Sequence, residues 1–299
     1  MQSAYSIYQQ PFLDYIIFEK RYSGNTAIAY EEDLNQFFEY LENTYSNPPL
    51  TDILPIYIRS WLAEMMKNGI SARTVNRKIS TLKAFFKYHI RAGNLKTTPM
   101  TTVISPRISR RLPVFVEQKD TDILFSEIDF GNDFEGKTHR LIVELFYTTG
   151  VRRDELINIK ESGIDLAGQM LKVLGKGNKE RLIPLSNYIL DRIKDYILSK
   201  REIKNADSTF LLVGSKGKKL YSKYVYLIVK KYLSLVTTIE KKSPHILRHT
   251  FATHLTNKGA DINAVKELLG HTSLAATQVY THNTIERLKE VHKKSHPKA

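Results

Sequence analysis

The chain has 299 residues, of which 42% are hydrophobic and 25% charged, so its length favours two globular domains over one. It contains no cysteine, which excludes disulfides, thiol catalysis and cysteine-ligated zinc. Its formal net charge of +14 predicts an anionic partner, such as nucleic acid, a membrane surface or an acidic protein.

The positive charge is unevenly distributed along the chain. Residues 1–104 carry 11 Lys and Arg against 9 Asp and Glu, whereas residues 105–299 carry 34 against 22. No apolar run approaches the roughly 20 residues that span a bilayer, and the first residues lack a signal-peptide core. We therefore expect a soluble, cytoplasmic protein with no membrane partner, whose basic function is concentrated in the second part.

Residues 4–104 are predicted to be helical. One helix is expected over Thr26–Leu41, where apolar residues recur near a 3.6-residue period, and a second from about Ile56 to Lys67. A third helix is expected after Ser71, which can cap it. Its apolar stripe is Val75, Ile79, Leu82, Phe85 and Phe86.

The opposite face of that third helix is basic. It carries Arg73, Arg77, Lys78, Lys83 and Lys87. Such a face is typical of a solvated surface, and it also has a suitable shape for lying against phosphates. The sequence leaves both interpretations open.

Residues 97–113 contain three prolines and three arginines and show no apolar period, which predicts an exposed, basic linker between domains. We place the first domain at 1–104, the linker at 105–113 and the second domain at 114–299. In the second domain, only residues 170–185 suggest strands, two short ones joined by a turn at 175–178. The expected fold is mainly α, with an N-terminal helical domain and a C-terminal mixed α/β domain containing a small sheet.

Five elements of the sequence can carry chemistry, although each alone resembles an ordinary structural feature. Near Arg152, the run YTTGVRRDEL indicates one helix that ends at Gly150 and another that begins. Lys176 lies in the predicted turn, where flanking glycines allow close approach to a ligand. On a helix, His245 and Arg248 share one face, because they are three residues apart.

The last two elements are LGH at residues 269–271 and Tyr280. We expect Gly270 to end a helix, and Tyr280 follows His271 by nine residues. Neighbouring histidines suggest a metal, but the chain has no His-Glu-x-x-His pattern and no paired carboxylates near them. We therefore expect no metal and no cofactor, and assign His254 a structural or surface role.

Taken in order, these elements resemble the signature of the tyrosine recombinase/phage integrase family. The likeness is closest to the Xer branch, whose members resolve chromosome dimers, and it extends over the whole chain. It implies that residues 1–104 form a SAM-like, core-binding DNA-binding domain and residues 114–299 the catalytic domain. It assigns catalytic roles to Arg152, Lys176, His245, Arg248, His271 and Tyr280, and a supporting role to Glu155.

The resemblance implies a site-specific DNA recombinase that cuts and rejoins DNA through a 3′-phosphotyrosine at Tyr280, without ATP or metal. Arg152 and Arg248 would stabilise charge on the phosphate, with His271 as a further donor. The hydroxyl of Tyr280 has an unperturbed pKa of about 10, so a base is needed, for which His245 is the candidate. Lys176 would protonate the departing 5′-oxygen.

The expected partner is double-stranded DNA, bound by a tetramer of this chain alone or with a paralogous recombinase, and a DNA translocase is the candidate activator. Near the C-terminus, Ile285, Leu288 and Val291 form a narrow apolar stripe. By resemblance this segment packs on an adjacent subunit, although a groove on its own domain is the alternative.

Three alternative functions remain open. An integrase or transposase of a mobile element would use the same site, and a type IB topoisomerase would share the nucleophile chemistry. The early start of the first predicted core helix favours the Xer-like interpretation over integrases with an additional arm-binding domain. A catalytically inactive DNA-binding module is disfavoured, because every position of the signature is filled.

Overall fold

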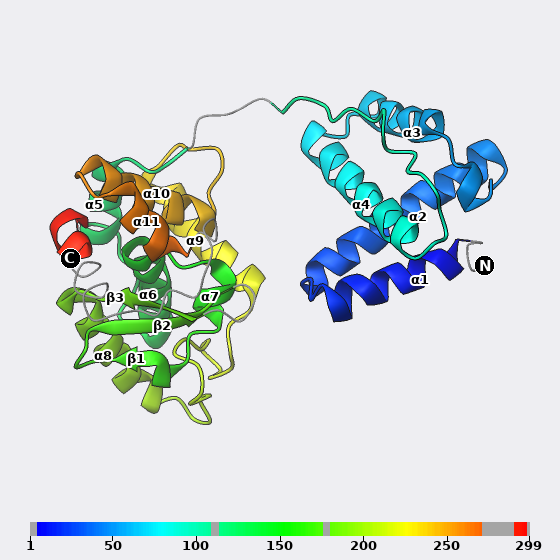
Figure 1. Cartoon of the computed structure of the whole chain (residues 1–299). Coiled ribbons are helices and arrows are strands. Elements are labelled where there is room, and N and C mark those ends of the chain that lie inside the picture. The colour runs from blue at the N-terminus through cyan, green and yellow to red at the C-terminus, as the bar shows by residue number, and fades with distance from the viewer. Residues whose placement is uncertain (1–4, 109–113, 176–179, 271–289, 298–299) are drawn as a thin grey trace. The chain divides into compact units, whose positions relative to one another are not determined.

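The computed structural model describes residues 5–108, 114–175, 180–270 and 290–297. The chain divides into two compact units, Met1–Arg111 and Leu112–Ala299 (Figure 1). The first unit is helical, and the second combines helices with one small antiparallel sheet, which confirms the predicted fold class. Within the described ranges, no helix has the length and apolar character needed to cross a membrane.

The first unit packs four α-helices around an aromatic-rich core, with α4 in contact with each of the other three. The elements are α1 (Ser6–Asp14), a π-helical turn (Tyr15–Glu19), α2 (Gly24–Tyr45), a 3-10 turn (Leu50–Asp52), α3 (Pro55–Lys67) and α4 (Ala72–Arg91). Ser71 caps α4 by accepting a hydrogen bond from the backbone N–H of Thr74 at 3.3 Å. All five residues of the predicted α4 stripe are buried.

Part of the predicted linker belongs to the first core. Met100 and Val103 are 5% and 6% exposed and pack into this core. In addition, the side-chain amide of Asn76 donates to the carbonyl of Pro106 at 2.9 Å. The expectation of an exposed segment from residue 97 onward was therefore wrong for this stretch, because two isolated apolar residues produce no period.

A buried ion-pair network changes the predicted basic face of α4. Asp33 of α2 is fully buried and accepts hydrogen bonds from Lys78 and Thr81, each at 2.8 Å, and from Arg77. Lys78 is only 4% exposed, so its placement on a solvent face was wrong. Of the five basic residues predicted on this face, Arg73, Lys83 and Lys87 are exposed and do not contact Asp33.

In the second unit, α6 is the central helix. Twelve of its 16 residues are buried, as expected for a helix covered on all sides, and it contacts α7, α8, α9 and α10. The helices are α5 (Gln118–Ser126), α6 (Phe134–Thr149), α7 (Arg153–Ile157), α8 (Asn187–Arg201), α9 (Ser222–Val236), α10 (Pro244–Asn257) and α11 (Ile262–Leu269), with a 3-10 turn at Glu161–Gly163.

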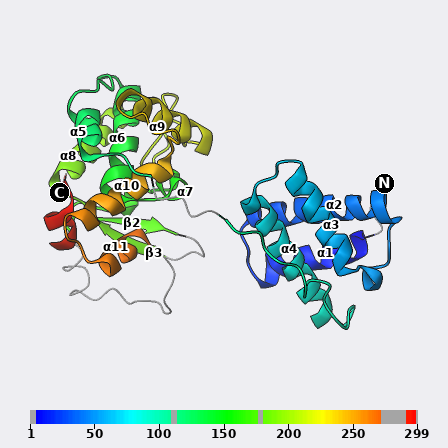
Figure 2. The same ribbon diagram turned by 90° about the horizontal axis from the view of Figure 1, so that it is seen from above.

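The sheet has the order β1 (Ile164–Asp165), β2 (Met170–Leu174), β3 (Glu180–Pro184), with both pairs antiparallel. The two predicted strands correspond to β2 and β3, and β1, with only two residues, was not predicted. Residue pairs Leu171–Ile183 and Val173–Arg181 lie opposite each other. As Figure 2 shows, α11 lies beside β3, so the end of α11 is close to Arg181.

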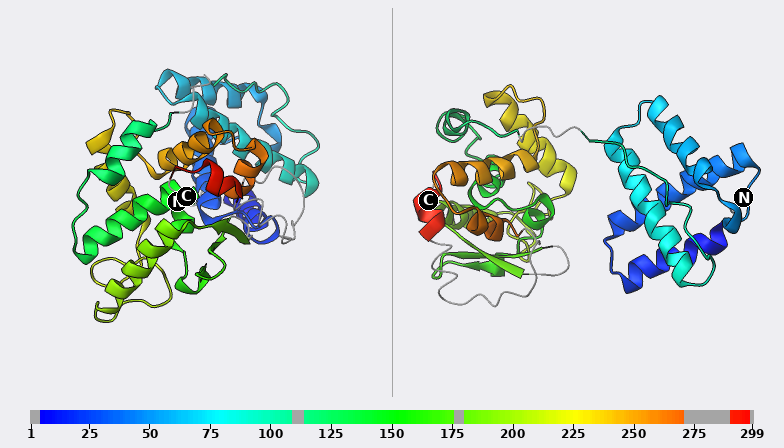
Figure 3. Two further views of the ribbon diagram at one scale, coloured as in Figure 1. Left: turned by 90° about the vertical axis from the view of Figure 1, so that its left-hand side faces the viewer. Right: turned by 45° about the horizontal axis from the view of Figure 1, so that its top comes forward.

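Residues 290–297 lie against their own unit, next to α10 and α11 (Figure 3). Val291 packs on the small core around Phe251. The Nε2 atoms of His292 and His296 are 2.9 and 3.0 Å from the carbonyl oxygens of Thr148 and Tyr147. Ile285 and Leu288 are outside the described residues, and packing of the tail on a neighbouring subunit stays a prediction.

The Asp33 network generates a stability prediction. Replacing Asp33 with Ala leaves the ammonium group of Lys78 buried without its carboxylate partner, so we expect a loss of about 3–5 kcal/mol in the free energy of unfolding. Urea denaturation of the full chain measures this loss. The control is Glu32→Ala at an exposed position of α2, for which a change within about 0.5 kcal/mol is expected. Equal effects of the two substitutions would contradict the structural role of Asp33.

Candidate active site

The site begins where α6 ends and α7 starts. Gly150 follows α6 with a positive φ of 60°, and a Cβ atom there would lie 2.5 Å from the ring of Phe251. Both the left-handed backbone and the lack of space require glycine at this position. Two residues later, Arg152 is the N-cap residue of α7, and its backbone N–H donates to Glu155 at 2.7 Å.

Arg248 enters the site from α10, which begins with Pro244 after the extended residue Ser243. Its guanidinium donates to two main-chain carbonyls, those of Gly150 and Leu269. With an exposed fraction of only 7%, Arg248 links the end of α6 to the end of α11.

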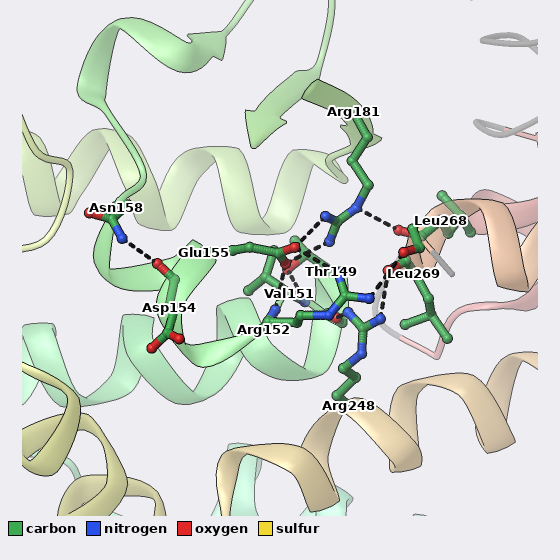
Figure 4. A network of polar contacts seen from close by, with 12 residues as sticks. Thr149, Val151, Arg152, Asp154, Glu155, Asn158, Arg181, Arg248, Leu268 and Leu269 are labelled. Carbon is green, nitrogen blue, oxygen red and sulfur yellow. Dashed lines mark hydrogen bonds and ion pairs between the residues drawn. The ribbon is translucent and has the colours of Figure 1, made fainter. Parts of the chain in front are cut away.

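The end of α11 receives two more arginines, as Figure 4 shows. Arg152 donates from Nη2 to the carbonyl of Gly270 at 3.0 Å, and Arg181 donates from Nε to that of Leu268 at 3.1 Å. Gly270 itself has a left-handed φ of 63°. Three consecutive carbonyls, at 268, 269 and 270, therefore each accept from a different guanidinium.

One carboxylate connects these arginines. Glu155 is 5% exposed and accepts two bonds from Arg181, at 2.6 and 2.8 Å, and one from the Arg152 side chain at 2.8 Å. Burial alone would raise the pKa of Glu155, but the hydrogen bonds and charges of Arg181 and Arg152 lower it to about 2. The carboxylate therefore stays charged throughout the physiological pH range.

The site carries an excess of positive charge. Three guanidiniums face a single carboxylate, so the group keeps a surplus of two positive charges. Burial, and then the charges of Arg152 and Arg181, lower the pKa of Arg248 from its ordinary value. A negatively charged group beside Arg248 would relieve this repulsion, so the arrangement is suited to binding an anion such as a phosphate.

His245 lies in the first turn of α10, and its side chain is partly accessible. Burial lowers its pKa first, and the nearby positive charges of Arg153 and Arg248 lower it further. The imidazole is therefore predominantly neutral near pH 7, which is the form that accepts a proton.

The structure brings together Arg152 and Arg248, and places Glu155 beside Arg152. Lys176, His271 and Tyr280 lie outside the described residues. His254 belongs to a different environment, since its ring contacts the hydroxyl of Tyr147 at 3.1 Å and the carbonyl of Val116 at 3.0 Å. His254 is buried, and the contacts that it makes within the described part of the chain are structural.

Arg181 is the residue of this cluster that we did not predict. A signal was present in the sequence: Arg181 lies two residues before buried Ile183 in a strand, so both side chains point to the same face. A charged residue at an inward strand position needs a partner, although the sequence alone does not identify that partner as Glu155.

Family models match both units. Residues 10–93 match the phage integrase N-terminal SAM-like domain, and residues 115–287 match the phage integrase family. Tyrosine recombinase XerC of Thermodesulfovibrio yellowstonii is 38% identical over 96% of this chain and 95% of its own. XerC of Listeria monocytogenes serotype 4a is 38% identical over 97% and 98% of the two chains.

Solved structures show the same fold. XerH recombinase bound to its difH substrate matches with a TM-score of 0.72 and 22% identity, covering 95% of this chain and 94% of that one. The Tn1549 transposon integrase on transposon-end DNA matches with a TM-score of 0.69 and 20% identity, covering 95% and 98%. The chain therefore belongs to the phage integrase family of tyrosine recombinases. The resemblance to its Xer-type branch is confirmed.

Proposed function

We propose that this protein is a Xer-type enzyme that cuts and rejoins double-stranded DNA through a covalent bond between Tyr280 and a 3′-phosphate. The observation that carries this proposal is the convergence of Arg152 and Arg248 in a cluster with surplus positive charge. Resolution of chromosome dimers is the proposed role, because full-length relatives carry the XerC name.

In the proposed reaction, the Tyr280 oxygen attacks phosphorus and the bond to the 5′-oxygen of the next nucleotide breaks. The tyrosine proton passes to His245, and the leaving oxygen takes a proton from Lys176. Arg152 and Arg248 bind the nonbridging oxygens, on which negative charge increases in the transition state. Rejoining is the reverse reaction, and because the phosphotyrosine ester conserves the bond energy, it consumes no ATP.

DNA is the proposed partner of both units. The XerH and Tn1549 integrase structures contain DNA, which supports duplex binding by a chain of the same fold. We further propose that a tetramer forms on DNA, from four copies or with a paralogue, with activation by a DNA translocase. The proposed location of the reaction is the cytoplasm.

The first prediction concerns the nucleophile. Tyr280→Phe removes only a hydroxyl, so DNA affinity should stay within about twofold while the covalent adduct disappears. A cleavage site is first selected from host chromosomal fragments and is built into a nicked suicide duplex. The protein is mixed with this duplex, and a denaturing gel detects the covalent adduct. Tyr221→Phe, an exposed tyrosine on the same unit, is the matched control. An adduct that persists in Tyr280→Phe would exclude this nucleophile.

A pH dependence follows from the lowered pKa of His245. The base acts in its neutral form, so cleavage should slow as pH falls, with a midpoint below the ordinary value of about 6.5. His245→Gln should remove this acidic limb and slow cleavage by about 10²–10⁴. Single-turnover rates between pH 5 and 8 test this, with His249→Gln on the same helix as control. An unchanged limb in His245→Gln would assign the proton to another group.

The three exposed residues of the predicted basic face of α4 generate a salt prediction. Each phosphate neutralised contributes about −0.9 to the slope of log affinity against log salt. If Arg73, Lys83 and Lys87 contact phosphates, replacing all three with Gln should reduce the slope by about two to three. Lys67→Gln, exposed at the end of α3, is the single-charge control. A slope equal to that of the wild type would mean that this face of α4 is solvated in the complex.

A further inference from the structure

Arg152 and Arg181, which both donate to carbonyls at the end of α11, differ in how accessible their guanidiniums are to a ligand. The side chain of Arg152 is 35% exposed, so part of it is accessible to solvent. That of Arg181 is 6% exposed, and each of its three nitrogens already donates a hydrogen bond. Arg152 can therefore reach a phosphate, whereas Arg181 is enclosed by protein groups.

The contacts of Arg181 join three elements of the site. From β3, Arg181 donates hydrogen bonds to both carboxylate oxygens of Glu155 on α7. It also donates to the carbonyl of Leu268 at the end of α11. A bidentate pair between guanidinium and carboxylate fixes both groups in distance and in plane. Arg152 also donates to one of these oxygens, so both arginines contact the same carboxylate (Figure 4).

A second, independent contact places the end of α11 on the same side chain. A Cβ atom at Gly270 would lie 3.0 Å from Cδ of Arg181 and 3.3 Å from its Nε. Gly270 is therefore packed directly on the arginine, in a left-handed conformation that also favours glycine. Arg181 therefore contacts the end of α11 both through the carbonyl of Leu268 and through Gly270.

Removing Arg181 would have a specific electrostatic effect. Glu155 shares its charge between Arg181 and Arg152. With Arg181 absent, the buried carboxylate would rely on Arg152 alone and would draw its guanidinium away from a bound phosphate. The loss would therefore appear in the chemical step more than in DNA affinity.

We propose that Arg181 is a positioning residue of the cleavage step, which fixes Glu155, and through it Arg152, together with the end of α11. This inference rests on the proposed function, because it concerns how fast the Tyr280 adduct forms. In this role Arg181 does not contact the substrate, and it acts through Glu155, Arg152 and the end of α11.

The experiment measures two quantities on the full chain with the nicked suicide duplex: half-site affinity, and the single-turnover rate of adduct formation at saturating protein. Arg181→Met keeps the length of the side chain and removes every donor. We expect affinity within about threefold of the wild type and a cleavage rate reduced by about 10²-fold, the usual effect of displacing a reacting group by about 1 Å. Arg181→Lys keeps the charge without the bidentate fork, and should cleave at an intermediate rate.

Two further variants separate positioning from a loss of folding. In the Arg181→Met background, Glu155→Gln should restore part of the cleavage rate, since it removes the uncompensated carboxylate that draws on Arg152. Gly270→Ala adds a Cβ atom that would crowd the Arg181 side chain. It should therefore slow cleavage although Arg181 itself is unchanged. Arg192→Met, at an arginine of α8 paired with Glu144, is the matched control and should cleave at the wild-type rate.

The outcomes are distinguishable. If the wild-type protein forms no adduct on any duplex, the proposed function fails and this inference fails with it. If the wild type forms the adduct and Arg181→Met cleaves at the same rate, only the positioning role is overturned. A rate that falls solely in proportion to the folded fraction, with no recovery in the Glu155→Gln double variant, also overturns it. If Arg181→Met does not fold, Arg181→Lys and Gly270→Ala decide the question by the same two measurements.

Discussion

Two helices, α6 and α11, end at the candidate active site, and the last carbonyls of any α-helix have no partner within the helix. Leaving such groups buried and unpaired costs about 1–3 kcal/mol each. Here, cationic and histidine side chains provide the partners. The carbonyls of Tyr147, Thr148 and Gly150 accept from His296, His292 and Arg248, and those of Leu268, Leu269 and Gly270 accept from Arg181, Arg248 and Arg152.

This requirement explains how several cations can be kept close together without DNA. The carbonyl end of a helix carries partial negative charge, which stabilises a nearby guanidinium. Glu155 adds a full negative charge on the side away from α11. The arginines are therefore held in place by contacts formed on folding, and a preset array of donors is what stabilisation of a charged transition state requires.

Local signals in the sequence predicted much of this arrangement. Gly150 and Gly270 were expected to end helices, and both have the left-handed φ that such ends require. Ser71 and the apolar stripe of α4 were recognised from capping and period, which depend only on residues within a few positions. The branch of the family was recognisable because five short motifs occur in the right order.

What was missed depends on residues far apart in the chain. Lys78 was expected in solvent because its partner, Asp33, is 45 residues away, and helical spacing carries no information about that pairing. Arg181 and Glu155 are 26 residues apart, and strands β1 and β2 lie between them in the chain. The two residues of β1 are too few to show alternation. The catalytic roles of the six predicted residues rest on the family signature, and of these residues Lys176, His271 and Tyr280 are outside the described part of the chain.

The partners of each arginine also determine which can serve a substrate. Arg248 and Arg181 are equally buried, so exposure alone does not separate their roles. The acceptors of Arg248 are neutral carbonyls, and a phosphate oxygen, which carries formal charge, is a stronger acceptor than these. Arg181 already holds a charged carboxylate through two bonds, so a phosphate gains little by competing for it. Both arginines are shielded from water, so the difference between them is the strength of the acceptor that each already has. Arg248 can exchange its neutral carbonyl acceptors for a phosphate, whereas Arg181 keeps its carboxylate partner and holds Glu155 in position.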